Sequence, residues 1–176
     1  LNEKLIEELN DAGLSRINLS IDSMDPEKAM YLAGTSFYNL DRILELAEYV
    51  TKNTEIDLLI APVWVPGIND EDIPKIIEFA LKIGAGKKWP PLGIQKFEWH
   101  KRGRKPKKVK YQTWRQFYNA LKEWERRYKV KLILSPEDFG IHRRRTYPTP
   151  FKIGHTVRAK ILAPGWLKNE FLGVAK

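Results

Sequence analysis

Three polar side chains that stand close together in the sequence, those of Ser20, Asp22 and Ser23, are the first candidates for binding a ligand. They lie near the end of residues 16–22, in which apolar and polar residues alternate with the period of a β-strand. A hydroxyl both donates and accepts hydrogen bonds, so this set suits a polar ligand. Because ligands of parallel sheets bind outside the carboxyl ends of the strands, we expect a site at this strand end.

The residues on either side of this strand predict the helices that position it. Residues 1–12 carry apolar residues at helical spacing and end before Gly13, and glycine is the usual residue just past a helix. Asp25 and Pro26 open a second helix as its N-cap and its first helical residue. A helix, a strand and a helix in so short a span predict an α/β fold with parallel strands.

The chain continues this alternation as far as residue 142. Asn39 and Thr113 are expected to cap helices whose apolar residues fall on one face, and Asn69 or Asp70 to cap another. The expected strands are residues 16–22, 55–65, 92–99 and 130–134, and the expected helices are residues 1–12, 26–32, 40–50, 71–82 and 114–128. The strand at 55–65 is almost continuously apolar, as is typical of a strand covered on both faces.

The last part of the chain has a different character. Residues 143–150 are basic and rich in turn residues, which is typical of a linker. Residues 157–161 and 167–174 have strand-like spacing on either side of the turn residues Pro164 and Gly165. We therefore expect residues 151–176 to form the opening strands of a small all-β appendage. Since both ends of the chain look cut, we also expect it to be a fragment of a longer protein.

The composition excludes several classes of protein. The chain has 176 residues, of which 43% are hydrophobic, so it is not a disordered chain. It contains no cysteine, which excludes disulfides, a cysteine nucleophile and cysteine-ligated metals within it, and its three histidines lack the spacing of metal ligands. The apolar run at residues 58–65 is too short to span a bilayer, and no segment resembles a signal peptide. These features favour a cytoplasmic protein with no membrane partner and no metal site of its own.

The net charge of +9 favours a polyanionic partner, although a surface rich in Lys, Arg and Glu, as in thermophilic proteins, is an equal alternative. The loop after residues 92–99 is strongly basic and contains Lys101, Arg102, Arg104 and Lys105. Such a loop is usually a solvated run of charge. At the carboxyl end of a strand, however, its cationic groups would also suit the phosphates of RNA or of another phosphorylated substrate.

Gln95 is a polar residue within the apolar strand predicted at 92–99. Burying an amide without partners costs about 1–3 kcal/mol, so Gln95 is expected to have a defined partner. A contact with substrate and a structural hydrogen bond are equal alternatives. Glu98 would point to the opposite face of the strand unless a bulge intervenes.

Several of these segments resemble a known family. The stretch AGLSRINLSIDSMDPEKAMYLAG at residues 12–34, followed by NLDRILELAEYV at 39–50, resembles the middle of the barrel of radical SAM enzymes. It is similar to the branch of cyclases that make the molybdenum cofactor. The stretches APVWVPGINDEDIPKIIEFALKIG at 61–84 and LGIQKFEWHKRGRK at 92–105 resemble the units that follow, in the same order. The tail PTPFKIGHTVRAKILAPGWLKNEFLGVAK at 148–176 resembles the start of an RNA-binding β-barrel of the TRAM or OB kind.

The resemblance implies a fold. Residues 1–142 would be the C-terminal part of a (β/α) TIM-like barrel with parallel strands, residues 143–150 a linker, and residues 151–176 an incomplete TRAM- or OB-like β-barrel.

The resemblance also implies a chemistry. In this family a four-iron four-sulfur cluster reduces S-adenosylmethionine (SAM), and the resulting 5′-deoxyadenosyl radical abstracts a hydrogen from the substrate. A CxxxCxxC loop after the first barrel strand holds the cluster, and this cysteine-free chain lacks that loop. The N-terminal half of the barrel is therefore expected to be missing and the chain alone to be inactive. A degenerate relative without a cluster is the alternative.

The resemblance assigns roles to individual residues. Ser20 would touch the ribose hydroxyls of SAM, or else bond neighbouring backbone. Asp22 would orient the ligand or the substrate, or else bond the amides of its own turn. Ala61, Pro62 and Val63 would pack on the adenine, or else simply belong to the core. The implied function is a radical SAM enzyme acting on RNA (such as tRNA) or another phosphorylated substrate. The alternative is a non-catalytic RNA-binding module.

Overall fold

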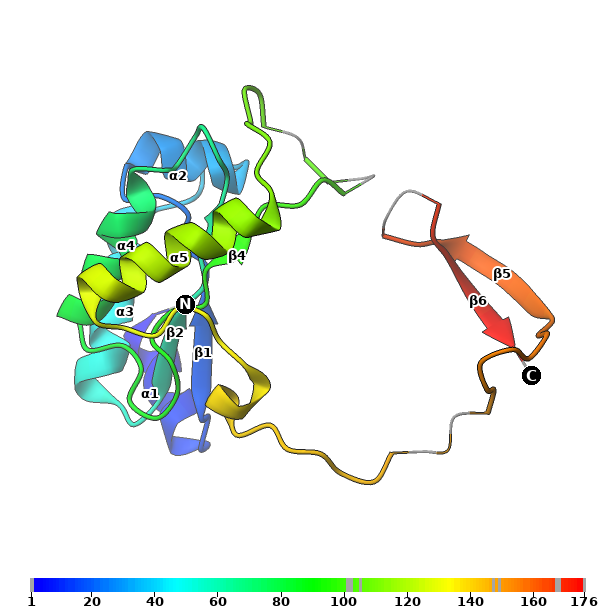
Figure 1. Cartoon of the computed structure of the whole chain (residues 1–176). Coiled ribbons are helices and arrows are strands. Elements are labelled where there is room, and N and C mark those ends of the chain that lie inside the picture. The colour runs from blue at the N-terminus through cyan, green and yellow to red at the C-terminus, as the bar shows by residue number, and fades with distance from the viewer. Residues whose placement is uncertain are drawn as a thin grey trace. The chain divides into compact units, whose positions relative to one another are not determined.

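The computed structural model of the chain describes residues 2–100, 103–104, 106–146, 148, 150–166 and 169–175 (Figure 1). The chain divides into two compact units, each described here by itself. The first unit comprises Leu1–Phe97 and Lys107–Ile141, and the second comprises Glu98–Pro106 and His142–Lys176. The predicted site at the carboxyl end of the first strand belongs to the first unit.

Helices and short strands alternate along the first unit, as the sequence predicts. The helices are α1 (Glu3–Asp11), α2 (Pro26–Ala33), α3 (Leu40–Asn53), α4 (Asp72–Lys82) and α5 (Trp114–Tyr128), followed by the 3-10 helix η1 (Pro136–Phe139). The strands are β1 (Arg16–Leu19), β2 (Asp57–Ile60), β3 (Val63–Trp64) and β4 (Gln95–Lys96). The side chains of Asp25, Asn39 and Thr113 each accept a hydrogen bond from the backbone in the first turn of α2, α3 and α5. The three predicted caps are therefore confirmed.

The strands of the first unit are parallel. β1 pairs with β2 from Arg16↔Asp57 to Leu19↔Ile60, and β3 pairs with β4 (Figure 1). A parallel bridge between Ile60 and Leu92 connects the two ladders. The continuous segment of β2 and β3 therefore lies between β1 and the strand that contains β4. Parallel pairing between strands joined by helices confirms the α/β class, and membership of a larger TIM-like barrel remains a prediction.

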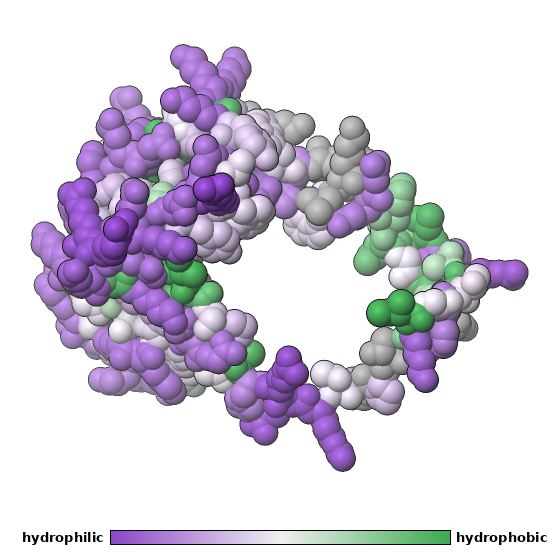
Figure 2. Space-filling view, viewed as in Figure 1, coloured by the Kyte–Doolittle hydropathy of each residue, from purple (hydrophilic) through white to green (hydrophobic). Residues whose placement is uncertain are grey.

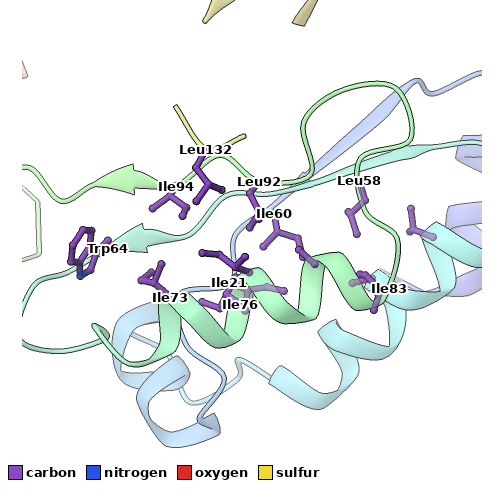
Figure 3. Packing of buried hydrophobic residues seen from close by; sticks show 14 of the residues in the cluster. Ile21, Leu58, Ile60, Trp64, Ile73, Ile76, Ile83, Leu92, Ile94 and Leu132 are labelled. Atoms are coloured by element: carbon purple, nitrogen blue, oxygen red, sulfur yellow. The ribbon is translucent and has the colours of Figure 1, made fainter. Parts of the chain in front are cut away.

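The core lies between this sheet and the helices. Leu58 and Ile60 of β2 are buried on the helix side, together with Ile73 and Ile76 of α4. Figure 3 shows Ile21 and Ile60 lying over α4. Burying a side chain of this size contributes about 1.5–3 kcal/mol, so this layer is the main source of stability for the sheet.

Two of the predicted strands differ from the observed ones for reasons of hydrogen bonding. The strand expected at 55–65 is interrupted between β2 and β3 at Pro62, which has no backbone N–H to donate. Residues 130–134 form no strand, so the prediction of a fourth strand there is wrong. The backbone N–H groups of Leu132 and Ile133 instead donate to Glu125 Oε1, at 2.7 and 2.9 Å.

The predicted cap of α4 is also wrong. The helix begins after Glu71, whose side chain makes no capping hydrogen bond. Asp70 instead accepts hydrogen bonds from Trp64 Nε1 at 2.8 Å and from the backbone N–H of Gly67 at 2.6 Å. Asp70 is therefore a turn residue that stabilises the Pro66–Gly67 corner, and Asn69 has a different role described below.

The second unit contains a two-stranded antiparallel sheet. It consists of β5 (Ala159–Pro164) and β6 (Phe171–Ala175), with a shift of register between Ile161 and Ala163. β5 lies two to three residues later than the strand predicted at 157–161. The assignment of residues 151–176 to a TRAM- or OB-like barrel stays a prediction. Among the helices of the described residues, none combines the length and the apolar character needed to cross a membrane.

Candidate functional site

The face of the sheet opposite the helices borders an open hollow of about 980 Å³. Side chains of a parallel strand point alternately to its two faces, so the neighbours of the core residues in β1 and β2 point here. Asn18 and Leu59 line the hollow from these strands, with Ala61 directly after β2 and Gln95 in β4. Polar amides and small or aliphatic groups thus share one concave surface.

Ser20 lies one residue beyond the end of β1, and its side chain is exposed. Its backbone carbonyl accepts a hydrogen bond from the hydroxyl of Tyr38 at 3.1 Å. Burial, reinforced by the negative charge of Asp22, raises the pKa of Tyr38, so its hydroxyl is held in the neutral, donating form. Tyr38 therefore fixes the backbone that presents the Ser20 hydroxyl.

Asp22 joins the end of β1 to the beginning of β3. Its Oδ1 accepts a hydrogen bond from the backbone N–H of Val63 at 2.7 Å. Asp22 therefore bonds a backbone amide, which was the expected alternative to a contact with a ligand. This amide belongs to the neighbouring strand β3, however, and not to the turn of Asp22 itself. A role of Asp22 toward a ligand remains a prediction.

Asn69 completes the same junction from within the protein, where its side chain is fully buried. Its Nδ2 donates to the backbone carbonyls of Asp22 at 2.7 Å and Val63 at 2.9 Å. Its Oδ1 accepts from the backbone N–H of Val65 at 2.7 Å. One amide side chain therefore replaces the backbone pairing that is absent between these segments.

A buried carboxylate anchors the loop after β1 to α4. Asp72 Oδ1 accepts hydrogen bonds from the Ser23 hydroxyl at 2.8 Å and the Met24 backbone N–H at 3.0 Å, and Lys28 Nζ lies 2.5 Å from Oδ2. Burial alone would raise the pKa of Asp72, but the hydrogen bonds from Lys28, Ser23 and Met24 outweigh it and lower the pKa. Ser23, a candidate for ligand binding in the sequence, is thus committed to this anchor.

A stacked arginine borders the hollow at the amino ends of the strands. The guanidinium of Arg16 lies 5.3 Å from the ring centre of Trp89 and 5.1 Å from that of Phe139. The loop that carries Trp89 is fixed by Asp57, whose buried carboxylate accepts the backbone N–H groups of Lys87, Lys88 and Trp89, each at 2.8 Å. Arg16, Trp89 and Phe139 therefore line the floor of the hollow, at the amino end of β1.

The structure brings together most of the predicted cofactor-binding residues. Asp22 and Val63 are in direct contact, and Ala61 is hydrogen-bonded through its backbone to Leu19, at 2.9 Å. Ala61 and Pro62 are buried, and Val63 is half-buried. Their role toward adenine remains a prediction.

The predicted substrate residues have a mixed outcome. The expectation that Gln95 is buried is wrong, because this residue is exposed on the open face of the sheet. Lys101, Arg102 and Lys105 lie outside the described residues. Arg104 is exposed and belongs to the second unit, so its proposed phosphate contact stays a prediction.

Sequence reasoning missed the residues that hold the site in shape. Asn69 looks like a simple turn residue, and only the spatial approach of two strand ends reveals its three hydrogen bonds. Tyr38 lies in the loop between α2 and α3, and no sequence pattern around it distinguishes it. Among the described residues, no three His, Asp or Glu side chains are grouped so that they could hold a metal ion.

Comparison with known proteins identifies the family. Residues 1–80 match the model of the radical SAM superfamily. The whole chain is 45% identical to uncharacterized protein MJ0103 of Methanocaldococcus jannaschii, of which it covers 44%. Over 83% of its length the chain is 31% identical to the probable GTP 3′,8-cyclase of Pyrococcus abyssi, of which it covers 43%. Over 43% of its length the chain is 36% identical to the GTP 3′,8-cyclase of Marinobacter nauticus, of which it covers 22%.

The chain spans less than half the length of these relatives. The match includes β1, β2, β3 and α4 up to residue 80, and with them Ser20, Asp22 and Asn69, which lie in the segments between these elements. The chain belongs to the radical SAM superfamily.

Proposed function

We propose that the whole protein is a radical SAM enzyme and that this chain supplies part of the SAM-binding surface. SAM would lie on the open face of the sheet, at the carboxyl ends of β1 and β2. The single observation that carries this proposal is the hydrogen bond from the Val63 backbone N–H to Asp22, which joins the segments just after β1 and β2. Ala61, in the second of these segments, lines the open hollow of about 980 Å³. Family membership and the general position of ligands in parallel sheets support the same location.

The residues present fit the chemistry of SAM. The exposed hydroxyl of Ser20 suits a ribose hydroxyl, since both groups donate and accept. The small side chain of Ala61 leaves space for a flat ring against the strand, and the amides of Asn18 and Gln95 line the same hollow. When bound, SAM supplies the organic radical of this chemistry. The residues of this chain would bind and orient it.

The iron–sulfur cluster does not fit the residues of this chain, because the sequence contains no cysteine. The cluster ligands would come from another part of the whole protein.

The substrate class proposed is a phosphorylated one. Two of the relatives are named as GTP 3′,8-cyclases, and the net charge of +9 favours an anionic substrate. RNA belongs to the same proposal, because it offers the same phosphate chemistry.

Equilibrium dialysis of radiolabelled SAM against the 176-residue chain tests the proposal. Ser20→Ala is expected to weaken binding about 2- to 13-fold, because one lost hydrogen bond costs about 0.5–1.5 kcal/mol. Ser36→Ala is the matched control, because Ser36 is an exposed serine in the loop between α2 and α3. Equal affinities of both variants and the unchanged chain would reject the role of Ser20. A chain that takes up no SAM would favour the non-catalytic module.

A further inference from the structure

The exposed side of α5 carries a pair of aromatic rings that the proposed SAM site does not use. Trp114 and Tyr118 are stacked, with ring centres 5.8 Å apart and planes inclined by 26°. Both remain substantially exposed, Trp114 at 54% and Tyr118 at 42%. Phe117, between them in sequence, is buried in the core instead. Trp114 and Tyr118 therefore form an exposed, stacked aromatic pair, called the platform below.

A cation and a groove adjoin this platform. Lys96 Nζ of β4 lies 5.0 Å from the ring centre of Trp114. A hollow of about 320 Å³ runs beside the two rings and is lined by β4 and by residues 132–134. The platform therefore has a positive charge at one side and a concave path leading along it.

Basic side chains follow the platform along α5. Lys122 stands four residues after Tyr118, and residues four apart lie on the same face of a helix. A second hollow, of about 440 Å³, is lined by Lys122, Glu125, Arg126 and Lys129. The Glu125 carboxylate oxygen Oε1 already accepts two backbone N–H groups, so the lining of this hollow is mainly cationic. The surface over α5 is correspondingly hydrophilic in Figure 2.

We infer that this surface, made of Lys96, Trp114, Tyr118, Lys122 and Arg126, binds single-stranded nucleic acid. Unpaired bases stack on exposed aromatic rings, and the phosphates that follow along the strand pair with Lys and Arg. Charge complementarity with the chain's net charge of +9 supports a polyanion as the occupant. The stacked rings favour a single strand over a duplex, whose bases are already stacked on each other.

The inference goes beyond the proposed function and does not require it. Binding is measured on the 176-residue chain without SAM, so a failure here would leave the SAM proposal intact. Failure of SAM binding would equally leave this surface intact.

Fluorescence anisotropy with a fluorescein-labelled, non-self-complementary RNA of about fifteen nucleotides tests the inference. Each stacked base contributes about 1–3 kcal/mol, which corresponds to a loss of about 5- to 150-fold for Tyr118→Ala or Trp114→Ala. Tyr118→Phe keeps the ring and is expected to retain most of the affinity. Phe37→Ala is the matched control, because Phe37 is an aromatic residue 94% exposed between α2 and α3.

A charge reversal at Lys122 tests the role of the basic side chains on α5, and it does not alter the packing around Trp114. Lys122→Glu is expected to weaken binding and to reduce the dependence of affinity on salt, whereas Lys4→Glu, an equal change on α1, is expected to do neither. The same RNA annealed to its complement, and heparin, are expected to bind more weakly than the single strand. Equal affinity for the duplex or for heparin, equal affinity for a free mononucleotide, or equal effects of Tyr118→Ala and Phe37→Ala would overturn the inference. Binding of an unfolded peptide in preference to the RNA would do so too.

Discussion

The carboxylate of Asp22 and the backbone N–H of Val63 are hydrogen-bonded at 2.7 Å, although 41 residues separate them in the sequence. This bond holds the loop after β1 against the start of β3. Asn69 reinforces it by donating to the backbone carbonyls of the same two residues, at 2.7 and 2.9 Å. The position of the exposed Ser20, just after β1, therefore depends on this junction as well as on the pairing of β1 with β2.

Asn69→Ala is expected to lower the free energy of unfolding by about 2–4 kcal/mol, because three buried or partly buried backbone groups lose their partner. Urea unfolding followed by circular dichroism measures the change. The matched control is Asn119→Ala on the exposed side of α5, which should change stability by no more than about 0.5 kcal/mol. Equal values for the two variants would show that the junction does not stabilise the fold.

Asp72 is expected to make the first unit sensitive to acid. Because its pKa is lowered in the folded state, the unfolded state binds more protons at low pH. The stability that Asp72 contributes is therefore fully present above the ordinary carboxyl pKa of about 4, and it is lost as the pH falls toward the folded value. Asp72→Asn should lower stability at pH 7 and flatten its decline between about pH 5 and 3.

Unfolding free energies measured across this pH range test the role of Asp72. Asp41→Asn is the control, since Asp41 is an exposed carboxylate in the first turn of α3. If the acid limb of Asp72→Asn follows that of the unchanged chain, the anchor formed by Ser23, Lys28 and Asp72 does not govern acid stability.

Glu125 is expected to stabilise the segment after α5 through its two backbone hydrogen bonds. Glu125→Ala should cost about 1–3 kcal/mol, whereas Glu125→Gln retains an acceptor oxygen and should cost less. Amide hydrogen exchange at Leu132 and Ile133 gives a local reading, and it should accelerate in Glu125→Ala only. Faster exchange in the exposed control Glu123→Ala as well would contradict this assignment.

The floor of the hollow should depend on the planar guanidinium of Arg16. Arg16→Met is expected to cost about 1–2 kcal/mol, because two cation–π contacts are lost, and Arg16→Lys to recover only part of that, since an ammonium stacks less well. Thermal or urea unfolding measures this, with Arg115→Met on the surface of α5 as control. If Arg16→Met lowers the free energy of unfolding no more than Arg115→Met does, the stack on Arg16 does not stabilise the fold.

Local patterns predicted the elements of the first unit better than their ends. The helix caps at Asp25, Asn39 and Thr113 follow from short-range hydrogen bonding, which depends on residues three apart. The absent strand at 130–134 could not be predicted, because it depends on Glu125, whose carboxylate takes the N–H groups that a strand would have used. Pro62 indicates the break in the second strand, but this indication was overlooked because the residues around it form a nearly continuous apolar run.

The position of the candidate site could be predicted from the sequence, but the contacts that hold it in shape could not. Ser20 and Asp22 stand at a strand end, and the rule for parallel sheets identifies that position from sequence alone. Asn69, Tyr38 and the stack on Arg16 depend on contacts between distant segments, which a single sequence does not contain. Gln95 was wrongly expected to be buried. Its strand borders an open hollow, where a polar amide needs no buried partner.

The most direct test of the SAM site is an NMR titration of the isotope-labelled 176-residue chain with SAM. If SAM binds to this face, the backbone amide signals of Ser20, Asp22 and Val63 shift together with one dissociation constant. The signals of Ala61 and Gln95 in the lining of the hollow shift with them. Signals of the outer faces of α1 and α3 should stay unchanged. Shifts confined to those helices, or no shifts at all at millimolar SAM, would contradict the proposal that this face binds the cofactor.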